Sequence, residues 1–281
     1  MRSMSHQTIL ITGSTDGLGK LTALGLAHRG ATVLLHGRNQ QRLEAVRQEI
    51  KEASGNDKVR IYRADFTSLD EVRELSERIR ADQEHVDVLI NNAGIGAGAR
   101  SLGREKSKDG YELRFAVNYL AHFLLTHQLL PLLRRSAPSR IVNVASIGQQ
   151  PLDFGNVMLD YGYDGLRAYR QSKLAQVMFT FDLAEDLRDS GVTVNCLHPA
   201  SLMNTKMVLE TDYFGDPMSS VKEGAYAVEY LATSPDLDGV TGEFFDGTRR
   251  ARANSQAYDK EARRRLRMLS EQLTRLDESG E

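Results

Sequence analysis

The chain has 281 residues, of which 41% are hydrophobic and 26% are charged, and its formal net charge is −2. This composition is typical of a globular protein, and the near-zero net charge argues against a nucleic-acid binder, whose domain would be basic overall. The single cysteine, Cys196, excludes an internal disulfide and a cysteine-based metal cluster, so we expect no bound metal.

The start of the chain, residues 1–7, is too short and polar for a signal peptide. No apolar run approaches the ~18 residues needed to cross a bilayer. We therefore expect a soluble, cytoplasmic protein without a membrane anchor.

Short apolar runs alternate with helical patterns along the chain. The expected strands are 8–11, 31–36, 58–64, 87–90, 140–145, 192–197 and 243–246, and helical patterns start at 17 and cover 40–53, 69–82, 111–133, 168–188 and 222–233. Strands that are apolar throughout and alternate with helices indicate a parallel sheet covered on both faces. Right-handed crossovers then give a doubly wound, three-layer α/β/α fold of the Rossmann type, with seven mostly parallel strands in one domain over 1–281.

Two long segments, 147–167 and 201–220, fit this alternation poorly. Their aromatic and methionine side chains favour the walls of an apolar pocket over disordered surface: Phe154, Met158, Tyr161 and Tyr163 in the first, and Met203, Met207, Tyr213, Phe214 and Met218 in the second. For Tyr161 and Tyr163, pocket wall and simple loop packing stay equally open.

Leucines recur at helical spacing between about 255 and 276, which predicts an amphipathic helix. We expect it to pack on its own domain or on a neighbouring subunit, with a solvated basic face. Acidic residues interspersed among its arginines argue against a membrane-surface or nucleic-acid role.

A glycine-rich segment at 12–19 lies between the first strand and the first helix. Glycines there permit a tight turn and let the backbone approach a pyrophosphate, which a helix N-terminus attracts. We expect a nicotinamide dinucleotide to bind at this turn, through Gly13, Ser14, Thr15, Asp16, Gly17, Leu18 and Gly19.

The end of the second strand indicates which dinucleotide binds. An acidic residue there would bind the ribose 2′-hydroxyl of NAD, but the chain has Gly37 followed by Arg38 and Asn39. The arginine fork suits a 2′-phosphate, so we predict NADP rather than NAD. Asp65, followed by Phe66 after the third strand, is placed to accept a hydrogen bond from the adenine amino group.

Tyr169 and Lys173 lie four residues apart in a helical pattern, so their side chains share one face. A phenol has an ordinary pKa of ~10, and a nearby ammonium favours the phenolate. The pair therefore predicts an acid or base that works near neutral pH.

Together these residues resemble the short-chain dehydrogenase/reductase family over about 8–247. Asn91-Asn92-Ala93-Gly94 is similar to a family motif, and Asn118, Ser146, Tyr169 and Lys173 occupy the positions of its catalytic residues. The surroundings of Asn39, of 91–94 and of His198-Pro199 are most similar to retinol-dehydrogenase-like and protochlorophyllide-reductase-like members, which often carry a membrane anchor.

The resemblance implies that the cofactor also contacts Asn92, Ala93, Gly94, Tyr169, Lys173, Pro199, Ala200 and Thr205. Two departures concern the loop under the nicotinamide: Pro199-Ala200 stands where the family has Pro-Gly, and Thr205 comes one residue late. Asp16 is not the basic residue that would help bind a 2′-phosphate, so Arg38 must do most of that work.

The implied activity is hydride transfer between NADP and a ketone, aldehyde or secondary alcohol, on a substrate that is apolar and not small. One alternative is a non-catalytic NADP-binding sensor, which would have no need of a complete proton relay. Another is epimerisation or dehydration of a nucleotide sugar, which would need a larger C-terminal substrate domain. We take His198 as a structural residue, and we expect a homodimer or homotetramer through the helices carrying Asn118 and Tyr169, as the resemblance implies.

Overall fold

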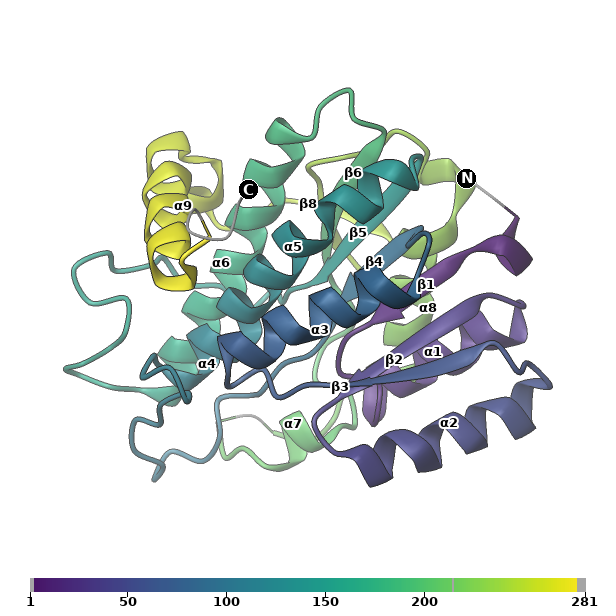
Figure 1. Cartoon of the computed structure of the whole chain (residues 1–281). Coiled ribbons are helices and arrows are strands. Elements are labelled where there is room, and N and C mark those ends of the chain that lie inside the picture. The colour runs from purple at the N-terminus through teal and green to yellow at the C-terminus, as the bar shows by residue number, and fades with distance from the viewer. Residues whose placement is uncertain (1–2, 214, 277–281) are drawn as a thin grey trace.

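The computed structural model describes residues 3–213 and 215–276. Within them, one eight-stranded sheet has the strand order β3-β2-β1-β4-β5-β6-β7-β8 (Figure 1). The strands are β1 (Thr8–Ile11), β2 (Thr32–Gly37), β3 (Val59–Arg63), β4 (Val88–Asn91), β5 (Ser139–Val144), β6 (Val192–His198), β7 (Phe244–Asp246) and β8 (Arg249–Ala251).

The first seven strands are parallel, as the sequence predicts, and β8 pairs antiparallel with β7 at the edge of the sheet. The eighth strand is absent from the prediction. It has three residues, it begins with two exposed arginines, and it carries no apolar run that sequence patterning could detect.

Helices cover both faces of the sheet, which makes the three layers that the sequence predicts. One layer holds α1 (Gly17–His28), α2 (Gln40–Ser54) and α8 (Val221–Thr233), and the other holds α3 (Leu69–Asp82), α5 (Ala121–Arg135) and α6 (Gly165–Asp186) (Figure 1). A separate apolar core fills the space between the sheet and each layer. Among the described residues, no helix is both long enough and apolar enough to span a membrane.

The chain order of the strands reverses beside β1, whose neighbours are β2 on one side and β4 on the other. In doubly wound sheets the crossover helices leave in opposite directions at this point, and a crevice opens beyond the carboxyl ends of the strands. The fold therefore provides a ligand site next to the glycine-rich turn that follows β1.

The helix predicted at 111–133 is present as one continuous helical segment whose first turns are irregular. It begins with the short helix α4 (Leu113–Phe115), continues through a π-helical turn (Ala116–Leu120) and then becomes α5. π-helical turns are rare and often occur at functional sites. The turn contains Asn118, one of the predicted catalytic residues.

The C-terminal helix α9 (Lys260–Thr274), which follows a 3₁₀ turn (Ser255–Tyr258), packs against α6 (Figure 1). Leu266 is buried in this contact, and the buried Arg263 donates to Glu185 of α6 at 2.7 Å. Arg267 forms a second ion pair with Asp182 at 2.6 Å. Two arginines of the basic face are therefore paired with acidic residues of α6, and the expectation of a solvated basic face is wrong for these two.

Three short elements complete the fold. A 3₁₀ turn (Met4–His6) precedes β1, and another (Pro235–Leu237) follows α8. The helix α7 (Lys206–Leu209) lies within the segment 201–220 that the sequence treats as a pocket wall.

Candidate active site

A cavity of about 550 Å³ lies at the carboxyl edge of the sheet. The ends of β1, β2, β4, β5 and β6 border it, together with the glycine-rich turn and parts of both long segments. Its volume is in the range of cofactor and small-molecule sites.

The glycine-rich turn is fixed to the segment that follows β4. The Thr12 hydroxyl oxygen accepts hydrogen bonds from the backbone N–H groups of Asn92 at 2.8 Å and Ala93 at 2.9 Å. In return, Asn92 Nδ2 donates to the carbonyl oxygens of Thr12 at 2.9 Å and Gly13 at 3.1 Å. The turn and the predicted Asn-Asn-Ala-Gly motif therefore form one rigid wall of the cavity.

Two positions of this wall require glycine, because neighbouring backbone lies too close to leave room for a side chain. Gly13 has a φ of 65°, and a Cβ added there would lie 2.7 Å from Ala93 Cα. A Cβ on Gly19 would lie 2.3 Å from the carbonyl oxygen of Gly13. The absence of side chains leaves backbone at the N-terminus of α1 facing the cavity, and this cradle fits the pyrophosphate of a dinucleotide.

The far end of the cavity, beyond β2 and β3, is lined by Gly37, Arg38, Arg42, Asp65 and Phe66. The Arg38 guanidinium makes no hydrogen bond or ion pair within the described part of the chain. Burial would raise the pKa of Asp65, but hydrogen bonds from Thr67 and the charge of Lys108 outweigh it and lower this pKa. This end therefore offers an unpaired cation and an ionised carboxylate.

His36 shapes this end of the cavity and was not singled out from the sequence. Its Nδ1 accepts from the backbone N–H of Gly13 at 3.1 Å, and its Nε2 lies 3.2 Å from the carbonyl oxygen of Ala64. The ring stacks on Phe66 with 4.3 Å between centroids. Burial lowers the pKa of His36 to about 4, so the imidazole is neutral and holds the glycine-rich turn against β3.

Two of the predicted cofactor residues do not line the cavity. The buried Ser14 hydroxyl donates to the carbonyl oxygen of His36 at 3.2 Å and accepts from its backbone N–H at 2.9 Å. Asn39 caps α2, accepting from the backbone N–H of Arg42 at 2.9 Å. Both side chains are used to fix the backbone.

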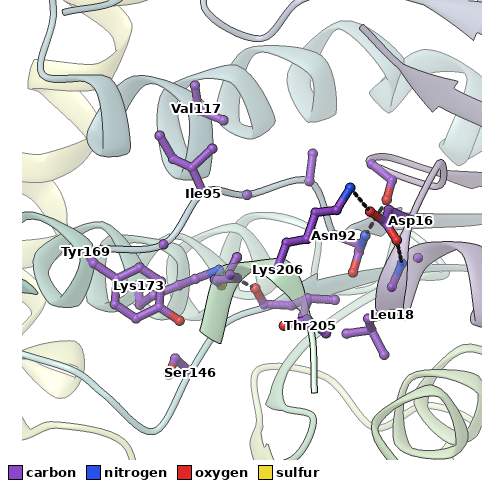
Figure 2. Close-up of a pocket in the computed structure, with 18 of the residues that line it drawn as sticks. Asp16, Leu18, Asn92, Ile95, Val117, Ser146, Tyr169, Lys173, Thr205 and Lys206 are labelled. Atoms are coloured by element: carbon purple, nitrogen blue, oxygen red, sulfur yellow. Dashed lines mark hydrogen bonds and ion pairs between the residues drawn. The ribbon is translucent and has the colours of Figure 1, made fainter. Parts of the chain in front are cut away.

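Ser146, Tyr169 and Lys173 meet at the other end of the cavity (Figure 2). Ser146 follows β5, and the other two lie one turn apart on α6. The Ser146 oxygen also accepts from the backbone N–H of Gly148 at 3.0 Å, which fixes its position. Three groups from two elements therefore converge on one point of the cavity wall.

Lys173 is fully buried, and its ammonium has two acceptors. Its Nζ donates to the carbonyl oxygen of Val144 and to Gln176 Oε1, both at 2.9 Å. Burial lowers the pKa of Lys173 to about 7. The lysine therefore exchanges protons near neutral pH.

The pKa of Tyr169 differs from the sequence expectation. Burial raises it, while a hydrogen bond with Ser146 lowers it by less. The Nζ of Lys173 lies 5.8 Å from the centre of the tyrosine ring, and it donates its hydrogen bonds to Val144 and Gln176. In the protein alone, the loss of water around the phenol outweighs the hydrogen bond with Ser146, and the predicted lowering of this pKa is wrong.

Asn118 lies behind the cavity wall. Its Oδ1 accepts from the backbone N–H of Ile95 at 2.8 Å, and its Nδ2 donates to Ser172 Oγ at 2.9 Å. A Cβ added to Gly94 would lie 3.3 Å from Asn118 Oδ1 and 3.8 Å from Lys173 Nζ. Asn118 therefore lies close to Lys173 and also fixes the segment that follows the Asn-Asn-Ala-Gly motif.

The segment 147–167 contributes Ile147, Gly148 and Leu166 to the cavity. The two tyrosines do not line it. Tyr161 is 68% exposed, and the Tyr163 hydroxyl accepts from the buried Arg114 at 2.7 Å. Loop packing is thus the correct alternative for Tyr163.

The segment 201–220 contributes residues 201–203 and 205–208, while Phe214 lies outside the described residues. Lys206 Nζ reaches Asp16 of the glycine-rich turn at 2.8 Å, so the segment crosses the cavity at this point (Figure 2). The hydrogen bond from Lys206 lowers the pKa of Asp16. The Thr205 methyl would lie 3.4 Å from a Cβ on Gly17.

Pro199, Ala200 and Thr205 also line the cavity. All the predicted cofactor and catalytic residues other than Ser14, Asn39 and Asn118 are thus brought together at one site. The structure adds lining residues that the sequence did not indicate: Arg42, Ile95, Leu113, Val117, Arg170 and Lys206.

The family model of the short-chain dehydrogenases matches residues 7–213, and the chain belongs to this family. It is accordingly an oxidoreductase that depends on a nicotinamide cofactor and acts on C–OH or C=O groups.

Within the family the chain is retinol-dehydrogenase-like. It is 38% identical to retinol dehydrogenase 13 of Mus musculus over 276 residues, which covers 92% of this chain and 81% of that protein. It is 35% identical to retinol dehydrogenase 11 of Homo sapiens, over 92% of this chain and 83% of the relative.

Two solved structures show the same arrangement of elements. An uncharacterised protein from Mycobacterium paratuberculosis is similar with a TM-score of 0.79 and 30% identity, covering 98% of this chain and 96% of the other. A short-chain dehydrogenase from Shigella flexneri 2a, solved in complex with NADP, has a TM-score of 0.70 and 28% identity, over 86% of this chain and 97% of the other.

Proposed function

We propose that the protein is an NADP-dependent oxidoreductase that transfers a hydride between the nicotinamide and the carbonyl or secondary alcohol of an apolar small molecule. The observation that carries the proposal is the convergence of Ser146, Tyr169 and Lys173 on one end of a cavity whose other end holds the unpaired Arg38. An anion-binding end and a proton-transfer end in one cavity are what such a reaction requires.

The preference for NADP rests on the end of β2. Gly37 places no carboxylate at the end of β2 itself, the nearby Asp65 is paired with Lys108, and Arg38 has no competing partner among the described residues. A guanidinium binds phosphate oxygens through two parallel N–H groups. Similar solved proteins from Shigella flexneri and Escherichia coli are complexes with NADP and NADPH, which supports the same preference here.

When bound, the nicotinamide supplies or accepts the hydride. Ser146 holds the substrate oxygen by a hydrogen bond, and the Tyr169 hydroxyl donates a proton to that oxygen during reduction. In the oxidation direction Tyr169 removes the proton. The raised pKa of Tyr169 favours the protonated phenol, which suits a proton donor.

Lys173, in the cavity wall, and Asn118, behind it, support this step. A lysine with a pKa of about 7 is able to take up and release a proton at neutral pH. Asn118, which lies beside it, holds a water that connects Lys173 to solvent in this proposal. After reduction, a proton passes from Lys173 to the Tyr169 phenolate through a bridging hydroxyl or water, which restores the phenol. In the oxidation direction the phenol first gives its proton to Lys173 by the same route, and the phenolate then takes the proton of the substrate.

The substrate end of the cavity is lined largely by apolar side chains, among them Ile95, Leu113, Val117, Ile147 and Leu166. Burial of apolar surface there favours an apolar substrate. The names of the similar retinol dehydrogenases support a substrate of this kind.

The cofactor preference is tested by Arg38→Asp. The proposal predicts that the variant loses at least ~10-fold in kcat/KM with NADPH, about 1.4 kcal/mol, and gains with NADH. Turnover of a panel of neutral aldehydes and ketones is measured with each cofactor. An unchanged preference for NADPH would refute the role of Arg38.

The sequence alone left a non-catalytic sensor of the same fold as an alternative, and no observation on the described residues favours it. NADPH binding without turnover of any carbonyl compound across a wide panel would favour it. The cytoplasmic location, the single domain and the homo-oligomer stay predictions. Part of the surface of α6 is covered by the chain's own α9, so an oligomer formed through α6 would have to use what α9 leaves free.

A further inference from the structure

The carboxylates that line the cavity have partners, whereas an arginine that lines it has none in the part of the chain that the structure describes. Within residues 3–213 and 215–276, two carboxylates line it, and both are paired: Asp16 with Lys206 at 2.8 Å, and Asp65 with Lys108 at 3.5 Å. Arg170 also lines the cavity, but its guanidinium makes no hydrogen bond or ion pair with any described residue. This arginine is partly buried as a whole residue, and none of its guanidinium nitrogens is among the fully buried atoms, so the charged group stays open to a ligand that enters the cavity.

Arg170 lies at the reacting end of the cavity. It follows Tyr169 on α6, and its Cγ lies 4.0 Å from the position that a Cβ on Gly148 would take. Tyr169 Cε1 lies at the same distance from that position, and Ser146 Oγ lies at 3.4 Å. The stem of Arg170 therefore runs beside the two groups that face the substrate oxygen.

Among the described residues, no carboxylate of the lining is available to Arg170, since Asp16 and Asp65 are both paired with lysines. A guanidinium is the side chain best matched to a carboxylate, with two parallel N–H donors. Such a pair is also stronger in a partly desolvated cavity than in water. The missing partner is therefore best supplied by a ligand.

We propose that Arg170 forms an anion subsite, and that the substrate is an amphipathic carbonyl compound or alcohol, with an apolar body and a carboxylate that pairs with this arginine. The carbonyl or alcohol group of this substrate follows from the proposed function, and its carboxylate follows from the unpaired Arg170. The apolar lining near Ile147 and Leu166 accommodates the body of the molecule.

The test is a calorimetric titration of the NADP-loaded protein with decanoate and, separately, with decanol. The two ligands share a chain length and differ in charge, and bound NADP keeps decanoate from the Arg38 end. The subsite predicts that decanoate binds at least ~10-fold more tightly than decanol. Arg170→Gln should reduce that ratio by ~10- to 100-fold, the range expected for hydrogen bonds to a charged group, and Arg170→Lys should retain part of it.

Arg188→Gln is the matched control, because Arg188 is exposed beyond the end of α6 and does not line the cavity. It should leave the ratio unchanged. Equal binding of decanoate by the native protein and Arg170→Gln, or a native protein that prefers decanol, overturns the inference. Decanoate binding through Arg170 in a protein that reduces no carbonyl compound would instead sink the proposed function and leave the anion subsite standing.

Discussion

Replacing Lys173 with methionine should stabilise the cofactor-free protein at pH 6 and destabilise it at pH 10. Burial lowers the pKa of this lysine from 10.5 to about 7. At ~1.4 kcal/mol for each pH unit, that fall corresponds to about 5 kcal/mol of folding free energy that the charged lysine costs at low pH. The unfolded chain binds the extra proton between pH 7 and 10.5, so the stability of the native protein rises with pH across this window.

Methionine removes this cost, but it also leaves the oxygens of Val144 and Gln176 without their donor. Each loss costs about 1–2 kcal/mol, so the net gain at pH 6 is about 1–3 kcal/mol. At pH 10 the lysine is largely neutral in the folded protein, and the lost hydrogen bonds then dominate.

The assay is urea unfolding of both proteins without cofactor at pH 6, 8 and 10. The difference in unfolding free energy should change sign across the series. Lys222→Met, at an exposed lysine of α8, is the control and should show a difference that does not vary with pH. A Lys173→Met protein that stays less stable than the native one by the same amount at every pH would refute the argument.

Lys206→Met leaves the Asp16 carboxylate unneutralised beside the glycine-rich turn, so NADPH should bind ~10-fold more weakly in a fluorescence titration. The double variant Lys206→Met/Asp16→Asn removes this carboxylate and should recover part of the affinity. An equally weak double variant would contradict the charge argument. Gly19→Ala forces a Cβ to within 2.3 Å of the Gly13 carbonyl oxygen, and the displaced turn should cost NADPH affinity by more than ~10-fold while far-ultraviolet circular dichroism is retained. Native affinity in Gly19→Ala would show that the turn does not form the cradle described here.

The sheet and the layers follow from local patterns in the sequence. The apolar run Thr8–Ile11 and the helical pattern that starts at Gly17 predict the first strand and the first crossover helix from the sequence alone. The structure has both elements, and the strand is buried at every position. The strand β8 and the π-helical turn at Ala116–Leu120 have no such local signal. Their geometry is set by packing against β7 and α6.

The site was predictable where function requires a particular residue type. Gly13, Tyr169 and Lys173 have spacings that only a few chemistries use, and the cavity brings them together as expected. Ser14 and Asn39 were predicted to bind the cofactor only from their positions in the chain. Each side chain instead accepts a hydrogen bond from a nearby backbone N–H group.

Other features of the site depend on distances that no sequence pattern encodes. Lys206 meets Asp16 across 190 positions of the chain, and Arg170 is notable only because nothing nearby pairs with it. The pKa of Tyr169 was mispredicted for a similar reason, because desolvation depends on the depth of the site, which helical spacing does not reveal.

The central claim, that Tyr169 transfers the proton at a cofactor-dependent redox site, is tested most directly by Tyr169→Phe in a paired measurement of turnover and NADPH binding. The account predicts that kcat for a carbonyl substrate falls by at least ~100-fold, about 2.7 kcal/mol, while the Kd for NADPH changes by less than ~3-fold. A Tyr169→Phe protein that keeps the native kcat would contradict it.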